Sequence, residues 1–231
     1  FEPGIVIQVW NDEPINILGS LSANDVTFAP GFPDLFWGGL AITGTAGTRT
    51  ESNFINCEIL NAINPISIIN SSPIINTVYI APIDTTAIIN GTGITVIGVS
   101  CPAIDSVTIL SYKTGIQVIR GEENLPTEPI INQIILRNSS VSQRQEENNT
   151  TGIVIAGKSN VIITDVDIKD YDTAVKIENT NPLQSANPSL SHIRIRNTSS
   201  TLRNEDKCGI ELKGNENAIL NDVQIEECTQ S

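Results

Sequence analysis

The sequence is poor in several residue types, and each shortage narrows what the chain can be. It has no Met and one His, and aromatic residues make up 4% of its 231 residues. Lys and Arg number 13 against 26 Asp and Glu, which gives a net charge of −13. Nucleic acids and anionic lipid surfaces are bound through Lys and Arg, so this balance argues against both as partners. No apolar run approaches the roughly 18 residues that a membrane span needs.

Two further absences concern processing and metals. The lack of Met and of a charged-then-apolar leader is typical of a processed or trimmed chain. The four cysteines, Cys57, Cys101, Cys208 and Cys228, show neither CxxC nor CxxC…HxxH spacing, so no metal site or other cofactor is predicted from them. We expect buried free thiols, with a Cys208–Cys228 disulfide as the alternative.

What the sequence does have is a repeated strand pattern. Seven segments alternate apolar with polar residues, as strands with one buried face do: 57–60, 77–82, 106–111, 133–138, 165–170, 192–197 and 222–227. A second apolar strand follows each of the first six, often starting at a Gly: 65–69, 86–89, 115–119, 152–156, 174–177 and 209–213. The pattern predicts an all-β protein.

A longer period groups these strands into larger units. PIIN occurs at 73–76 and again at 129–132, and LRNSS at 136–140 is similar to IRNTS at 195–199. These spacings indicate a repeating unit of roughly 56–60 residues that holds two coils. An antiparallel sandwich, with a hairpin at 89–93, is the competing architecture. A parallel solenoid is favoured, because stacked coils explain why similar strands recur in the same order.

We therefore predict a parallel β-helix of about seven coils over residues 53–231. Its two-coil repeat covers 73–128, 129–188 and an incomplete 189–231, and residues 1–52 form an N-terminal strand and cap region.

Two stretches resemble a known family. SNVIITDVDIKDYDTAVKIEN (159–179) is similar to the right-handed parallel β-helix repeats of the pectin-lyase-like superfamily, and VTFAPGFPDLFWGGLAITG (26–44) resembles the opening of such helices. The resemblance covers about residues 26–230 and implies a right-handed β-helix. It implies no single function, because the superfamily contains lyases, hydrolases, epimerases, tailspikes, adhesins and structural proteins.

The motifs of the enzymatic branches are not found. Polygalacturonase-like members carry NTD, DD, GHG and RIK, and none of these strings occurs here; RIR at 194–196 is the nearest approach. Pectate-lyase-like members bind Ca²⁺ through an Asp cluster, for which the candidates are Asp165, Asp167, Asp170 and Asp172. The resemblance is therefore to the non-enzymatic part of the superfamily.

Two of these carboxylates form a weak candidate metal site. Asp165 and Asp167 alternate with apolar residues, so both are predicted to point outward, about 6.6–7 Å apart. The favoured interpretation is structural: Asp167 pairs across the strands with Arg194. His192, beside Asp165, has no nucleophile next to it, so no catalytic residue is predicted.

Basic residues form a candidate ligand-binding strip. Arg137, Lys169 and Arg196 occupy the same outward position in three successive coils, with Glu226 next in line. Such a strip could bind an anionic polysaccharide, and the alternative is sideways pairing with nearby acids. Trp37, in LFWGGL, is either a sugar-stacking platform or, as we favour, a cap or core residue.

Glycosylation sequons suggest a secreted or cell-surface protein. Six Asn-x-Ser/Thr sequences occur, at Asn70, Asn90, Asn138, Asn148, Asn149 and Asn197. They lie at predicted turns or in polar inserts, where a glycan is tolerated.

The N-terminal PGIVIQV raises the question of self-association. It resembles the second strand that is missing after 222–227. Either residues 4–10 are the first strand of coil one, or this strand completes the open last coil of another subunit. In the second interpretation Gly4, Ile5, Ile7 and Val9 contact the partner, and head-to-tail contacts build a filament.

These observations predict an extracellular or surface structural protein, either a filament subunit or an adhesive spacer. The alternative is a polysaccharide-processing enzyme or a carbohydrate-binding β-helix.

Overall fold

The computed structural model describes residues 4–45, 52–84, 88–120, 127–138, 149–179, 187–196, 208–214 and 217–226. Within these ranges every regular element is a β-strand. The same ranges contain no helix of the length and apolarity needed to cross a membrane.

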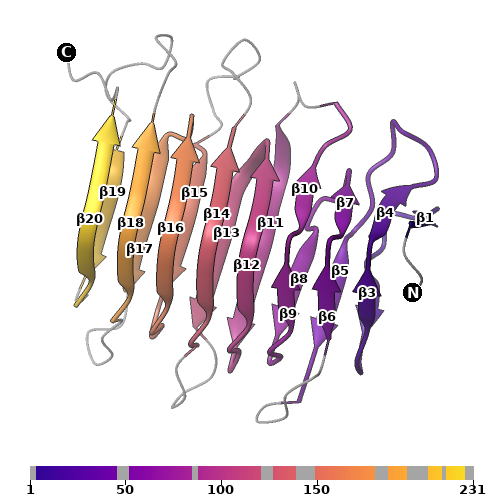
Figure 1. Ribbon diagram of the computed structural model, residues 1–231, viewed down its shortest axis with the longest axis horizontal. Helices are drawn as coiled ribbons and strands as arrows, with labels where there is room; N and C mark the ends of the chain where they lie inside the picture. Colours follow the sequence, from indigo (N-terminus) through magenta and orange to yellow (C-terminus); the bar gives the residue numbers. More distant parts are fainter. Residues whose placement is uncertain are drawn as a thin grey trace.

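The strands form two parallel sheets that lie back to back along the molecule (Figure 1). Sheet A contains twelve strands: β1 (Ile5–Val9), β3 (Ser22–Asn24), β4 (Val26–Pro30), β6 (Asn53–Ile55), β7 (Glu58–Leu60), β9 (Ile74–Asn76), β10 (Tyr79–Ala81), β12 (Ala103–Leu110), β14 (Ile130–Arg137), β16 (Ile162–Lys169), β18 (Ser189–Arg196) and β20 (Ile219–Glu226). Sheet B contains eight: β2 (Ile15–Ile17), β5 (Leu40–Thr43), β8 (Ile66–Ile69), β11 (Ile89–Gly98), β13 (Tyr112–Arg120), β15 (Thr151–Ala156), β17 (Thr173–Asn179) and β19 (Cys208–Gly214).

The chain alternates between the sheets, which is the path of a parallel β-helix. Each coil has one level of sheet A followed by one strand of sheet B, and the levels stack in chain order from β1 to β20 and from β2 to β19. The predicted all-β parallel solenoid is confirmed. The two sheets also include β1 to β5, which precede residue 53. Strands of three residues, such as β2 and β3, are too short to display the alternation on which the prediction relied.

A stacked row of residues with positive φ divides each level of sheet A in two. Eight residues at equivalent positions have φ of 51–56°: Asp25, Asn56, Thr77, Ser106, Gln133, Asp165, His192 and Asp222. Each lies between two inward-facing residues, as Gln133 lies between the buried Ile131 and Ile134, three positions apart. The positive φ therefore shifts the inward-outward alternation by one residue. Asn and Asp tolerate this conformation better than most residues do, which fits four of the eight positions.

The core consists of apolar columns that run the length of the solenoid. In sheet A one column joins Phe28, Ile59, Ile80, Ile109, Leu136, Ile168, Ile195 and Ile225 through successive strand pairs. In sheet B another joins Ile17, Ile42, Ile68, Val96, Val118, Ile155, Ile177 and Leu212. All members are buried except those at the C-terminal end, Ile225 and Leu212.

The N-terminal strand belongs to its own chain. β1 pairs in parallel with β4, with Ile5 beside Val26 and Ile7 beside Phe28. Residues 4–10 are thus the first strand of coil one, and the likeness of PGIVIQV to the sheet B strands is misleading, because β1 lies in sheet A. The similarity arises because strands of both sheets bury alternate apolar residues.

Candidate functional site

The basic column exists as predicted. Arg137 is in register with Lys169, Lys169 with Arg196, and Arg196 with Glu226, on the outer face of sheet A where the strands end. Within the described ranges neither Arg137 nor Lys169 has a carboxylate within ion-pair distance.

The third member of the column is neutralised, and its partner differs from the prediction. The Arg196 guanidinium donates to both carboxylate oxygens of Asp167. Asp167 lies on the neighbouring strand β16, two residues before Lys169, which is the residue in register with Arg196. Arg194, the predicted partner of Asp167, instead donates to both oxygens of Glu226 at 3.0 and 3.1 Å. This hydrogen bond raises the pKa of Arg194. The prediction of an Asp167–Arg194 pair was wrong because an Arg side chain is long enough to reach the diagonal neighbour.

The two carboxylates of the weak candidate metal site, Asp165 and Asp167, contact different partners. Asp165 Oδ1 lies 3.5 Å from His192 Nδ1, and on the other side His192 Nε2 lies 3.7 Å from Asp222 Oδ2. Asp167 is held by Arg196. No group of three His, Cys, Asp or Glu residues in the described chain is placed to hold a metal ion. His192 thus forms part of an exposed row with two carboxylates.

Trp37 is a core residue. Its side chain is fully buried, and its indole N–H donates to the carbonyl of Leu60 at 2.8 Å. The following Gly39 has φ of +102°, and a Cβ there would lie 1.9 Å from the carbonyl oxygen of Asn64. A sugar cannot stack on a ring with no exposed surface, so the sugar-platform alternative for Trp37 is wrong and the core role is the correct one.

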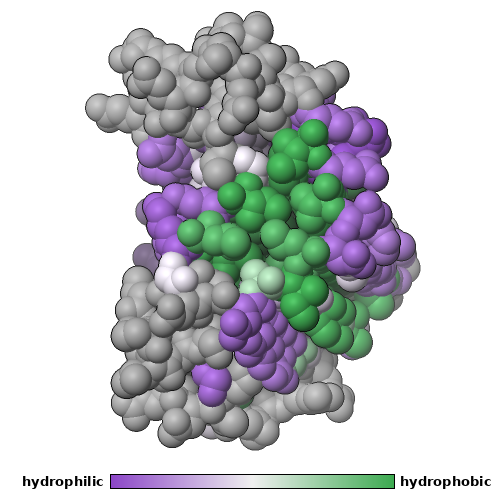
Figure 2. Space-filling view, turned by 90° about the vertical axis from the view of Figure 1, so that its left-hand side faces the viewer, coloured by the Kyte–Doolittle hydropathy of each residue, from purple (hydrophilic) through white to green (hydrophobic). Residues whose placement is uncertain are grey.

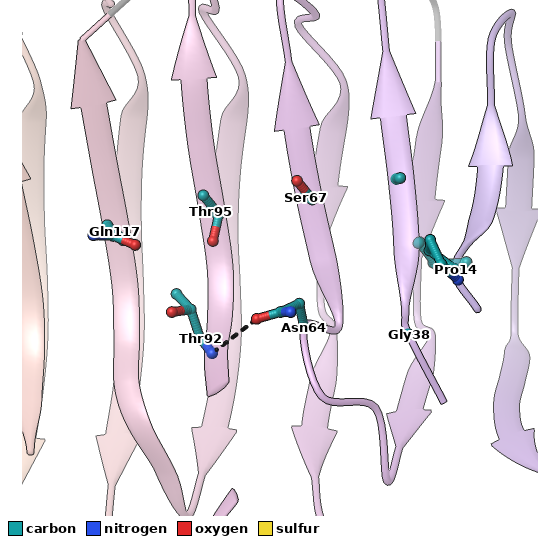
Figure 3. A pocket seen from close by; sticks show the side chains of 9 residues that line it. Pro14, Gly38, Asn64, Ser67, Thr92, Thr95 and Gln117 are labelled. Carbon is teal, nitrogen blue, oxygen red and sulfur yellow. Dashed lines mark hydrogen bonds between the residues drawn. The ribbon is translucent and has the colours of Figure 1, made fainter. Parts of the chain in front are cut away.

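Sequence reasoning missed a shallow groove on the outer face of sheet B (Figure 3). It holds about 360 Å³ and runs across the N-terminal coils, and Ser67, Thr95 and Gln117 stand in register along its floor. At one side, the Asn64 side chain accepts a hydrogen bond from the backbone N–H of Thr92 at 3.2 Å. The groove carries hydroxyl and amide groups and no charged side chain. The polar residues at the outward positions of 65–69, 94–97 and 115–119 are the sequence feature from which this groove could have been predicted.

A second hollow on the same sheet has a different character. It holds about 270 Å³ and is lined by Asn149, Thr151, Asp172, Thr173, Lys176, Glu211 and Lys213. Its charges satisfy one another: Lys176 pairs with Glu178 and Lys213 with Glu211, each at 2.6 Å, and Asp172 accepts from the N–H and hydroxyl of Thr150. The ion pair also raises the pKa of Lys213.

The last described strands, β19 and β20, carry partly exposed residues of the apolar columns. Leu212 on β19 and Leu220 and Ile225 on β20 continue the buried columns, yet 52%, 42% and 52% of their surfaces are exposed. Figure 2, which faces this end, shows apolar side chains gathered at its centre between hydrophilic ones. Single exposed apolar residues are normal, but a contiguous patch marks an interaction surface.

The Asn residues of the sequons differ in how exposed they are. Asn90 and Asn149 are exposed and Asn70 is half-buried, with its side-chain oxygen accepting from the Val99 N–H at 3.0 Å. Asn138 is buried, so as folded it is a poor glycan acceptor. The other two sequons, Asn148 and Asn197, lie outside the described residues, as does Cys228.

Two thiols can be assigned. Cys57 is inward and buried, as predicted, and burial raises the pKa of its thiol. Cys101 is exposed, so the prediction that it is buried was wrong.

Comparison with known proteins gives no relative. No protein-family model matches the chain, and no curated protein and no solved structure matches it either. The parallel β-helix is therefore assigned from the strand topology alone.

Proposed function

We propose that this chain is a structural subunit of a secreted or cell-surface fibre, and that copies associate end to end through the apolar C-terminal face. We further propose that it is a non-enzymatic member of the pectin-lyase-like superfamily, on the resemblance of residues 159–179 and 26–44. An adhesive spacer built from such units is the closely related role.

The observation that carries the proposal is the exposed end of the core. Leu212, Leu220 and Ile225 lie on the same columns as fully buried residues, so another apolar layer placed on them would continue a packing that already exists. Full burial of one such side chain contributes about 1.5–3 kcal/mol. An apolar sheet surface with an open strand edge is one that a further layer of strands can cover.

The proposed surface location draws on the sequons. Asn90 and Asn149 lie in N-x-Ser/Thr sequences and are exposed, so a glycan could be attached to both without disturbing the core.

A carbohydrate-binding β-helix is the second candidate, favoured by two observations. The groove of sheet B offers uncharged hydroxyl and amide groups from three successive coils, and Arg137 and Lys169 lie unpaired within the described chain on sheet A. If the basic column binds an anionic glycan, Arg137→Glu with Lys169→Glu should abolish retention on a heparin column, and equal retention of both proteins would exclude that role.

The test of end-to-end association is sedimentation velocity over a wide range of protein concentrations. We expect the chain of residues 1–231 to form larger species as concentration rises, and Ile225→Lys to abolish them. Ile162→Lys is the matched control, because Ile162 is 47% exposed on the side of the solenoid and the change in charge is the same. A chain that stays monomeric throughout, or equal losses in both variants, would refute the proposal.

A further inference from the structure

We propose that the groove on the outer face of sheet B binds the first sugars of an N-linked glycan that is attached to Asn90 of the same chain. This is the groove whose floor carries Ser67, Thr95 and Gln117 (Figure 3). The inference rests on the proposed secreted or cell-surface location, and it does not depend on end-to-end association.

The sequon Asn90-Gly91-Thr92 leads directly to the groove. Asn90 is exposed on β11. Thr92, the residue that an N-glycosylation sequon requires two positions later, is itself one of the residues that line the groove. Two residues of extended strand span about 7 Å, so the point at which a glycan is attached lies at the edge of the groove.

The backbone holds this attachment point against the neighbouring coil. A Cβ at Gly91 would lie 1.9 Å from the carbonyl oxygen of Ile63, so the two coils approach each other closely here. The next residue of that coil, Asn64, accepts a hydrogen bond from the Thr92 N–H at 3.2 Å (Figure 3). A glycan on Asn90 therefore leaves the protein from a fixed position beside the groove.

The floor of the groove matches the chemistry of the sugars at the base of an N-linked glycan. N-acetylglucosamine and mannose are uncharged and offer hydroxyl and acetamide groups, and none of the residues that line the groove is charged. Ser67, Thr95 and Gln117 stand in register on successive strands, about 4.8 Å apart. Their hydroxyl and amide groups can both donate to and accept from neighbouring sugar hydroxyls.

An apolar row beside this floor suits the ring faces of sugars. Ile69, Ile97 and Ile119 lie two residues farther along the same three strands, in register with one another, and all are half-buried on the outer face. A pyranose ring has apolar C–H faces and polar edges, and adjacent polar and apolar rows can contact both. The groove volume of about 360 Å³ is within the range of ligand sites.

The second exposed sequon provides an internal comparison. Asn149 lies beside the other hollow of sheet B, where charged side chains are already paired, as Lys213 is with Glu211 at 2.6 Å. Uncharged sugars gain little from groups that satisfy one another. We therefore expect a glycan on Asn90 to be bound to the protein and a glycan on Asn149 to move freely.

The first test is whether Asn90 carries a glycan. Residues 1–231 are secreted from a eukaryotic host that attaches oligomannose glycans, and peptide mass spectrometry measures the occupancy of each sequon. We expect Asn90 to be occupied. An empty Asn90 would overturn the inference and leave end-to-end association standing, because unglycosylated protein tests that association. A chain without a glycan at any sequon would also count against the proposed location.

The second test measures how accessible each glycan is. An endoglycosidase that cleaves between the first two N-acetylglucosamine residues is added to the native protein, and mass spectrometry follows release at Asn90 and Asn149. We expect release at Asn90 to be roughly tenfold slower, as for a glycan that is bound for about nine-tenths of the time. The two rates should converge in the unfolded protein. Equal rates in the native protein would overturn the inference.

A variant that fills the groove separates binding from steric crowding. Thr95→Tyr places a ring on the floor, so it should displace the glycan and raise the release rate at Asn90 towards that at Asn149. If crowding around Asn90 alone made release slow, the larger side chain would leave the rate unchanged or lower it, and that result would overturn the inference. Thr108→Tyr is the matched control, because Thr108 is also half-buried on an outer face, but on β12 of sheet A.

A smaller change at the same position keeps the test independent of how well the Tyr variant folds. Thr95→Val preserves the shape of the side chain and removes its hydroxyl. It should raise the release rate at Asn90 roughly two- to fivefold, the range expected when one hydrogen bond to a mostly bound glycan is lost. Thr108→Val should leave that rate unchanged. Equal rates in the two Val variants would contradict a contact between Thr95 and the glycan.

Discussion

Ile168 provides the sharpest test of how the columns stabilise the molecule. Its side chain is 1% exposed and lies between Leu136 and Ile195 in the sheet A column. A Cβ added at Gly152, in the facing sheet, would lie 2.9 Å from Ile168 Cγ2, so little space surrounds this side chain. Truncation to Ala therefore leaves a cavity that the backbone cannot readily close.

The magnitude follows from the lost burial and the cavity. Ile→Ala in a tight core costs about 2–5 kcal/mol of unfolding free energy. For a chain of this length each kcal/mol lowers the melting temperature by about 2–4 °C, so a loss of about 3 kcal/mol corresponds to roughly 6–12 °C. Thermal and urea unfolding followed by far-UV circular dichroism measure both quantities.

A control on the same strand makes the test specific. Ile162 also lies on β16 but points outward, and Ile162→Ala should change the unfolding free energy by less than about 0.5 kcal/mol. Ile168→Asp should be worse than Ile168→Ala, because it buries a carboxylate without a partner. Equal effects of the two Ala substitutions would refute the inward and outward assignment.

Three more predictions concern single sites. Gly39→Ala should destabilise the protein by several kcal/mol on urea unfolding, since its Cβ would meet the Asn64 carbonyl at a positive φ, whereas Gly19→Ala, with no atom within 4 Å, should be nearly neutral. Peptide mapping after maleimide treatment of the native protein should find Cys101 labelled and Cys57 unlabelled until denaturant is added, because Cys57 is buried with a raised thiol pKa; early labelling of Cys57 would contradict its place in the core. Burial raises the pKa of Tyr112, so its contribution to stability is complete below the unfolded pKa of about 10 and falls above it by about 1.4 kcal/mol per pH unit. The urea midpoint of the wild type should accordingly fall faster with alkaline pH than that of Tyr112→Phe, and parallel pH profiles would show that Tyr112 ionises in the native state.

The sequence predicted those features that depend on backbone periodicity. The alternation in 165–170 identified Val166 and Ile168 as inward, and the recurrence of similar strands placed Arg137, Lys169 and Arg196 in one column. Both inferences hold because parallel stacking repeats the same geometry in every coil. The periodicity contains no information on side-chain conformation, which is why the partners of Asp167 and Arg194 were assigned incorrectly.

Other features depend on long-range placement. β1 resembles a sheet B strand in sequence, and only its pairing with β4 assigns it to sheet A. The groove of sheet B is formed by side chains from several coils together with Pro14 and Gly38, which no local pattern connects. The exposed Cys101 lies in the connection between β11 and β12, where the strand pattern makes no prediction.

The parallel stacking has a mechanical consequence. Hydrogen bonds between neighbouring levels run along the axis of the rod, so tension applied to the two ends loads one row of bonds after another instead of all rows together. Equivalent positions in adjacent coils, such as Asp105 and Asn132, are 27 residues apart. Each coil that peels away therefore releases about 90 Å of extended chain. Under load the rod should lengthen coil by coil in large steps at low force, and so act as an extensible tether.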